Sequence, residues 1–139
     1  MNQSGLNEGF VEVSHTADWS LRVWAEDISG LFRQAALGMY ALMRLLVKSS
    51  TNVSREISME AGDEECLLVN FLSELLYLAE EEGMGFSTLT VNVKNHQLTA
   101  AGDIGEIESL EKVIKAVTFH NLAIKTNAGR YEVTIVFDV

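Results

Sequence analysis

The chain has 139 residues, of which 47% are hydrophobic, so a single domain spanning 1–139 can bury a sizeable core. Its 20 acidic residues against 10 basic ones give a formal net charge of −10, which repels nucleic-acid phosphates, so we expect no stable direct nucleic-acid binding. No apolar run reaches the roughly 18 to 20 residues of a membrane span, and the first residues do not follow the pattern of a signal peptide. We therefore expect a cytoplasmic protein with no membrane partner, whose acidic surface suits a divalent cation or a basic partner protein.

The first third of the chain predicts two strands and a helix. Apolar and polar residues alternate over 9–13 and again over 20–24, as in half-buried strands. Residues 28–47 then carry apolar side chains at helical spacing, and either Asp27 or Ser29 is suited to cap the start of that helix.

The middle third predicts a strand, a second helix and a hairpin. Residues 53–60 are rich in strand-forming types, and the broad apolar face that begins at residue 64 predicts a helix that ends at the acidic run before residue 83. Strand patterns over 86–93 and 97–102 flank a turn at 94–96.

The last third is less uniform. Residues 103–108 are acidic and interrupted by glycine, which predicts a loop. Residues 110–119 fit both the helical and the strand period, and we favour a strand from Val113 onward. Two further strands are expected at 122–125 and 131–137, joined by a hairpin turn.

This order of elements predicts an α+β fold, with a largely antiparallel sheet and two main helices packed against it. Each half of the chain has a strand-helix-strand-strand order, which is compatible with an internal duplication.

Candidate metal ligands stand at two distant places in the sequence. The polar break between the first two strands contains His15 and Asp18, and the chain ends on Asp138 and the α-carboxylate of Val139. Hard cations such as calcium, magnesium and manganese bind carboxylate oxygens of this kind. The alternative is a frayed, hydrated C-terminus, against which stands the strongly apolar strand that precedes it.

Three other polar residues have open roles. His15 suits metal ligation, general-base chemistry or the capping of a turn, and a lone histidine is most often structural. Lys115 and His120 bracket a buried-looking segment. The side chain of Lys115 either extends to solvent or supplies a cation near the Asp18 and Asp138 carboxylates or a partner's nucleotide phosphate. The sequence lacks the short motifs of nucleotide-binding loops, zinc proteases, serine hydrolases and EF-hands, so complete catalytic machinery is not visible.

Several segments, taken together, resemble archease. The matching segments run in order through almost the whole chain: HTAD at 15–18, LFRQAALGM at 31–39, LLVNFLSELLYL at 67–78, IKAVTFH at 114–120 and VFDV at 136–139. The chain departs from the family pattern at Trp19, where a small aliphatic residue is expected, at Phe71, where tryptophan is common, and at Phe119, where tyrosine is common.

The resemblance implies an α+β fold and a role as a protein cofactor, not an enzyme, of the RtcB-type RNA ligase of tRNA splicing and RNA repair. In that family archease promotes guanylylation of the ligase's active-site histidine, sustains multiple turnover and widens the range of nucleoside triphosphates accepted. The family's metal site maps onto Asp18, Asp138 and the Val139 carboxylate, with Lys115 a further functional candidate. Calcium is the expected ion, with magnesium or manganese as alternatives.

If one cation is shared in this way, the Asp18 carboxylate must lie within about 5 Å of the end of the chain, and His15 becomes a supporting residue beside the ligands. Two other functions stay open. One is a general chaperone-like modulator of nucleic-acid-processing proteins. The other is a stand-alone metal-dependent phosphodiesterase, against which stands the lack of a second cluster of metal ligands in the sequence.

Overall fold

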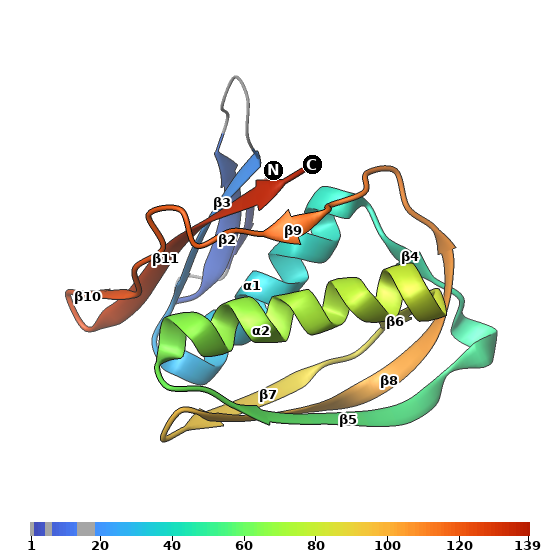
Figure 1. Cartoon of the computed structure of the whole chain (residues 1–139), viewed down its shortest axis with the longest axis horizontal. Coiled ribbons are helices and arrows are strands. Elements are labelled where there is room, and N and C mark those ends of the chain that lie inside the picture. Colours follow the sequence, from blue (N-terminus) through green and yellow to red (C-terminus); the bar gives the residue numbers. More distant parts are fainter. Residues whose placement is uncertain (1, 5–6, 14–18) are drawn as a thin grey trace.

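The computed structural model describes residues 2–4, 7–13 and 19–139, and the described strands form two antiparallel sheets (Figure 1). The first sheet has the order β1-β2-β3-β11-β10, and the short strand β9 pairs with the end of β11. Its strands are β1 (Asn2–Ser4), β2 (Gly9–Val13), β3 (Trp19–Ala25), β9 (Ala116–Val117), β10 (Lys125–Asn127) and β11 (Arg130–Asp138).

The second sheet is built around its longest strand, β8 (Gln97–Ser109). This strand pairs with β5 over most of its length, with β7 and β6 in succession, and with β4 near its end. The partner strands are β4 (Leu46–Val47), β5 (Val53–Glu60), β6 (Met84–Phe86) and β7 (Thr90–Lys94).

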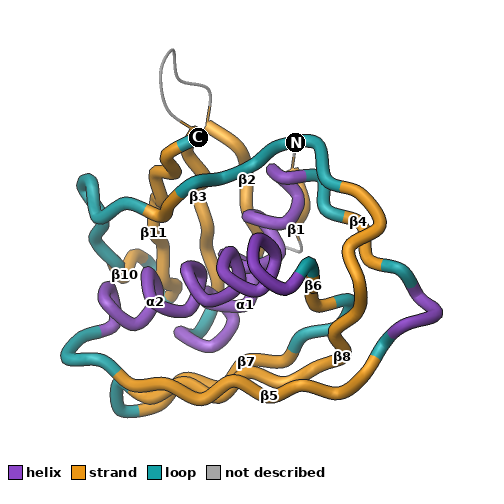
Figure 2. Tube along the Cα trace, turned by 45° about the vertical axis from the view of Figure 1, so that its right-hand side comes forward, coloured by secondary structure: helices purple, strands orange, loops and turns teal. Residues whose placement is uncertain are grey.

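Both helices lie between the two sheets (Figure 2). Helix α1 (Ile28–Met43) contacts β2 and β3 of the first sheet and β7 of the second, so its apolar residues are buried on several sides. Helix α2 (Glu64–Tyr77) contacts α1, β5 and β9. The rings of Phe32 and Phe71 stack between the helices with their centroids 6.3 Å apart. No helix in the described ranges is long and apolar enough to cross a membrane.

Polar side chains of α1 bind backbone groups of β6, of β7 and of the segment between them, and β8 pairs with these two strands along their other side. Ser29 Oγ accepts a hydrogen bond from the Val93 N–H at 2.8 Å, and Arg33 Nε donates to the Leu89 carbonyl oxygen at 2.9 Å. The Tyr40 hydroxyl accepts a bond from the last N–H of β6 at 3.2 Å, and burial raises the pKa of this tyrosine to about 12. The helix therefore covers a sheet edge that would otherwise expose unpaired backbone groups.

The helix ends follow capping rules. The Asp27 carboxylate accepts a hydrogen bond from the Gly30 N–H at 2.7 Å, so Asp27 is the N-cap of α1. The predicted extension of this helix to residue 47 is wrong, because Arg44 adopts a left-handed φ of 51° and the next residues form β4. Helix α2 continues through a π-helical turn, Leu78–Glu82, to Gly83, which confirms its predicted end.

The predicted fold class is confirmed, because two main helices pack on largely antiparallel strands. The strands predicted at 9–13, 20–24, 53–60 and 131–137 are present, within a residue at their ends, and the one predicted at 97–102 is the first half of β8. The arrangement in two sheets with the helices between them was not predicted, and the suggested internal duplication stays a prediction.

Four expectations for individual segments are wrong. Residues 103–108 form the second half of β8 instead of an acidic loop, because β6 and β4 pair with it there. The strand expected from Val113 is reduced to β9, since only its two residues reach the edge of β11. The strand predicted at 86–93 is interrupted between β6 and β7, and the one predicted at 122–125 begins at Lys125.

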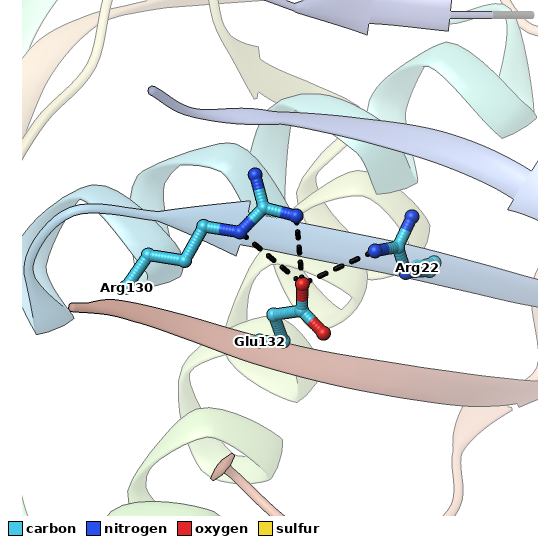
Figure 3. Close-up of polar contacts among 3 residues, drawn as sticks. All are labelled: Arg22, Arg130 and Glu132. Carbon is cyan, nitrogen blue, oxygen red and sulfur yellow. Dashed lines mark hydrogen bonds and ion pairs between the residues drawn. The ribbon is translucent and has the colours of Figure 1, made fainter. Parts of the chain in front are cut away.

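A charged cluster ties β3 to β11 on the face of the first sheet that points away from α1 (Figure 3). Glu132 Oε1 accepts hydrogen bonds from Arg22 Nη2 at 3.1 Å and from Arg130 Nη2 at 2.8 Å and Nε at 3.2 Å. The guanidinium carbons of Arg22 and Arg130 lie 5.3 and 5.7 Å from the centroid of the Trp24 ring, within cation–π range. The hydrogen bonds from Arg130, together with the charges of both arginines, hold the pKa of Glu132 below its usual 4.5.

We predict that Gly102→Ala lowers the free energy of unfolding by about 2 kcal/mol or more, as overpacking does. A Cβ at this position would lie 1.9 Å from the carbonyl oxygen of Thr88, which belongs to the backbone and cannot rotate away. Urea denaturation measures the change. Gly62→Ala is the matched control, since a Cβ there meets nothing within 4 Å, and equal effects of the two substitutions would contradict the packing at Gly102.

We also predict a pH-dependent contribution from Glu132. Its pKa is lower in the folded protein than in the unfolded chain, so its stabilising contribution is complete well above pH 4.5 and is lost as the pH falls through the lowered value. The difference in unfolding free energy between the wild type and Glu132→Gln should therefore shrink on acidification below pH 4.5. Glu108→Gln, at an exposed position on β8, is the matched control, and a difference for Glu132→Gln that does not change with pH would refute the assignment.

Candidate functional site

The candidate site lies where three strands of the first sheet end together. In the antiparallel register of the sheet, Phe137 on β11 is opposite Trp19, the first residue of β3, and also opposite Val117 on β9. The Phe137 side chain is fully buried, whereas the next residue, Asp138, is exposed, and Val139 is 41% exposed. The buried phenylalanine thus anchors a strand end whose last two residues face solvent.

Strand β9 holds the end of the chain by backbone hydrogen bonds. The Lys115 N–H donates to the Asp138 carbonyl oxygen at 2.7 Å, and the Thr118 N–H donates to the Val136 carbonyl oxygen at 3.0 Å. These bonds argue against the frayed C-terminus considered as the alternative, because Phe137 is paired with both β3 and β9, and Asp138 is paired with β9.

Three of the predicted site residues meet at this place. Lys115 precedes β9, and its backbone is bonded to that of Asp138, the neighbour of Val139. His15 and Asp18 lie outside the described residues, so the predicted approach of Asp18 to the chain end stays a prediction. His120 lies in the turn that follows β9. Its Nε2 is 3.3 Å from Asn121 Nδ2, and its backbone N–H donates to Thr118 Oγ1.

The donor set at the chain end suits a hard cation but needs a further ligand. Asp138 and the Val139 carboxylate offer oxygen atoms only, the ligand type that calcium and magnesium prefer. Within the ranges that the structure describes, no group of three or more His, Cys, Asp or Glu side chains is placed to hold a metal ion. A complete site would therefore require Asp18, which precedes Trp19 in the sequence.

A pocket that sequence reasoning missed opens beside Trp19. Lys112 Nζ lies 4.8 Å from the centroid of the Trp19 indole ring, and the two side chains border a cavity of about 250 Å³ between the first sheet and the end of α1. Its other lining residues are Phe10, Glu12, Leu21, Gly38, Ala41, Leu42 and Arg44. The only sequence signal was Trp19 itself, a large aromatic residue next to the polar break.

The Arg22–Glu132–Arg130 cluster was also missed. Arg22 and Glu132 are 110 residues apart in the sequence, so their contact depends on the pairing of β3 with β11. The available signal was the alternation in each strand, which places these charges at positions that face away from the apolar core.

A family model and individual relatives all match this chain to archease. The archease protein family (MTH1598/TM1083) matches residues 10–139. The protein archease of Methanosarcina barkeri is 34% identical over 145 aligned positions, covering 98% of this chain and 99% of the relative. That of Thermococcus kodakarensis is 33% identical over 134 positions, covering 90% and 94%.

Two solved structures share the fold. The solution structure of protein 1598 from Methanobacterium thermoautotrophicum has a TM-score of 0.66 and 28% identity, and the match covers 94% of this chain and 99% of that one. The crystal structure of an archease from Thermotoga maritima, described as a possible chaperone, has a TM-score of 0.70, 17% identity and coverage of 91% and 94%. The second likeness shows the fold alone. Because the family matches residues 10–139 and the M. barkeri relative, 34% identical, is covered over 99% of its length, this chain belongs to the archease family.

Proposed function

We propose that this protein is an activator of an RtcB-type RNA ligase in tRNA splicing and RNA repair, and that it acts in the cytoplasm as a protein cofactor without catalysing a reaction itself. The observation that carries the proposal is the paired end of β11, which holds Asp138 and Val139 at an exposed edge beside Lys115 in a member of the archease family. The effect on the ligase would be faster guanylylation of its active-site histidine and sustained turnover.

The proposed metal site consists of Asp18, Asp138 and the Val139 carboxylate, with calcium as the favoured ion and magnesium or manganese as alternatives. A divalent cation bound there would offer a concentrated positive charge to a phosphate group. The protein's own contribution is to fix the carboxylates, which the bond from the Lys115 N–H to the Asp138 carbonyl oxygen does for one of them. The exposed Lys115 side chain is suited to contact a phosphate of the partner's nucleotide.

Exposed apolar side chains near this edge support a protein partner. Val113 is 64% exposed and Phe119 is 56% exposed, and they stand on either side of Lys115 and β9 in the sequence. A ligase that binds RNA is expected to carry basic surfaces, which the net charge of −10 on this chain would attract.

A second candidate function is that of a general chaperone-like modulator. It is favoured by the description of the archease from Thermotoga maritima as a possible chaperone. Purification of a tagged copy from cells distinguishes the two, because the chaperone role predicts many co-eluting proteins, whereas ligase activation predicts one ligase.

We predict that Asp138→Ala reduces the stimulation of multiple-turnover ligation by a cognate ligase about tenfold or more, with a similar loss for Asp18→Ala, as expected when a metal ligand is removed. The measurement is the number of ligated ends per ligase molecule, with and without the activator.

Asp103→Ala is the matched control for ligation, because Asp103 lies on β8 in the other sheet and its hydrogen bonds are made by backbone atoms. Circular dichroism should show that all variants fold. If Asp18→Ala and Asp138→Ala both stimulate ligation like the wild type, the proposed mechanism is wrong.

We predict that calcium stabilises the protein through the same carboxylates. A ligand that binds only the folded state at 100 times its dissociation constant adds about 2.7 kcal/mol to the free energy of unfolding. This gain should disappear in Asp138→Asn and persist in Asp103→Asn. Titrations with magnesium and manganese rank the ions, and an equal calcium effect in both variants would remove Asp138 from the site.

A further inference from the structure

A second pocket lies on the free edge of β11, away from the chain end. Strand β10 pairs with β11 only at Arg130–Glu132, and β9 pairs with it only at Phe137 and Asp138. Between these two contacts the segment 118–124 passes without forming a strand. A cavity of about 200 Å³ opens there, and its lining includes Arg22, Asn121, Lys125, Glu132 and Thr134.

The strand register gathers four of these residues on one face. Thr134 is directly opposite Arg22 on β3, and Glu132 is directly opposite Lys125 on β10. Directly opposite residues of an antiparallel pair point to the same face with Cβ atoms about 5 Å apart, and Glu132 and Thr134 alternate onto that same face of β11. The block is therefore contiguous across three strands.

This block is locally positive in a chain whose net charge is −10. The Glu132 carboxylate is shared by two guanidinium groups, those of Arg22 and Arg130, so one positive charge of this trio is left over. The exposed Lys125 ammonium adds a second. The block therefore holds three cationic side chains and one carboxylate, namely those of Arg22, Arg130, Lys125 and Glu132.

The same residues supply hydrogen-bond donors. Arg22 contacts Glu132 through Nη2, and its Nε and Nη1 have no partner among the described residues. Lys125 has three N–H groups, and Thr134, an exposed residue, has a hydroxyl. Asn121 holds the rim of the pocket with a left-handed φ of 51°, which asparagine tolerates better than most residues.

We propose that this pocket binds a phosphate group. Two cations on separate strands line one open cavity together with Asn121 and Thr134, and the planar guanidinium fork of Arg22 suits paired phosphate oxygens. The ligand is a free phosphate or nucleotide, or a phosphodiester of RNA. Thr134 and Asp138 are four residues apart on β11, about 13 Å along a strand, so the pocket is separate from the proposed metal site and does not depend on it.

The first test is a titration of isotope-labelled protein with sodium phosphate, at an ionic strength held constant with sodium chloride and followed by the backbone amide NMR signals. The signals of Asn121, Lys125 and Thr134 should shift and saturate. Lys125→Gln should weaken the affinity about tenfold, as for loss of a charged hydrogen bond, whereas Lys94→Gln should not, because Lys94 is an exposed lysine on β7 of the other sheet.

Adenosine monophosphate and a short single-stranded oligoribonucleotide then distinguish the sources. If the oligonucleotide binds more tightly than inorganic phosphate, with a strong salt dependence, the ligand is an RNA backbone. If the mononucleotide binds as tightly as the oligonucleotide or more tightly, the ligand is a small phosphate compound. The proposal is overturned if none of the three probes shifts these signals. It is equally overturned if sodium chloride alone produces the same shifts, or if Lys125→Gln and Lys94→Gln bind alike.

Discussion

The position of α1 between the two sheets is the constraint on which the rest of the structure depends. Its apolar side chains fill the space beneath β2 and β3. On the other side, Ser29, Arg33 and Tyr40 bind backbone groups of β7, of the segment between β6 and β7, and of β6, respectively. A helix that is buried by both sheets must satisfy the polar groups it covers, since an unpaired buried N–H or carbonyl costs about 1 to 3 kcal/mol. These three side chains do so, and they thereby fix the second sheet relative to the first.

Strand β11 connects that core to both proposed sites. Val133, Ile135 and Phe137 point into the core and are buried, whereas Glu132, Thr134 and Asp138 lie on the opposite, outward face of the strand. Because β3 pairs along one side of this strand and β9 and β10 share the other, residues from four strands meet at its two ends. A change in the register of β11 by one residue would turn every one of these side chains to the opposite face.

The departures from the archease pattern have structural counterparts. Trp19 stands under the ammonium group of Lys112 at 4.8 Å, so the indole ring that replaces a small residue takes part in a cation–π contact at the rim of a pocket. Phe71 is fully buried against Phe32, where a ring without a polar group needs no hydrogen-bond partner. Phe119 is exposed, so the hydroxyl of a tyrosine at this position would face solvent or a partner instead of the core.

The sequence by itself determined the elements whose pattern is local. The alternation over 9–13 and 131–137 and the helical spacing after Asp27 and Asp63 identified strands and helices that the structure contains. The alternation of apolar and charged residues also set which side chains face the core. It located the carboxylates at the chain end.

Only the tertiary structure decided the features that depend on distant pairing. Residues 103–108 look like an acidic loop, yet β8 runs through them because β4 and β6 supply backbone partners. The ambiguous segment after Leu110 has only two residues in β9, since its conformation depends on the edge of β11 that it meets. Arg22 and Glu132, like Lys115 and Asp138, are brought together by antiparallel pairing over long separations, and no local periodicity encodes which strands become neighbours.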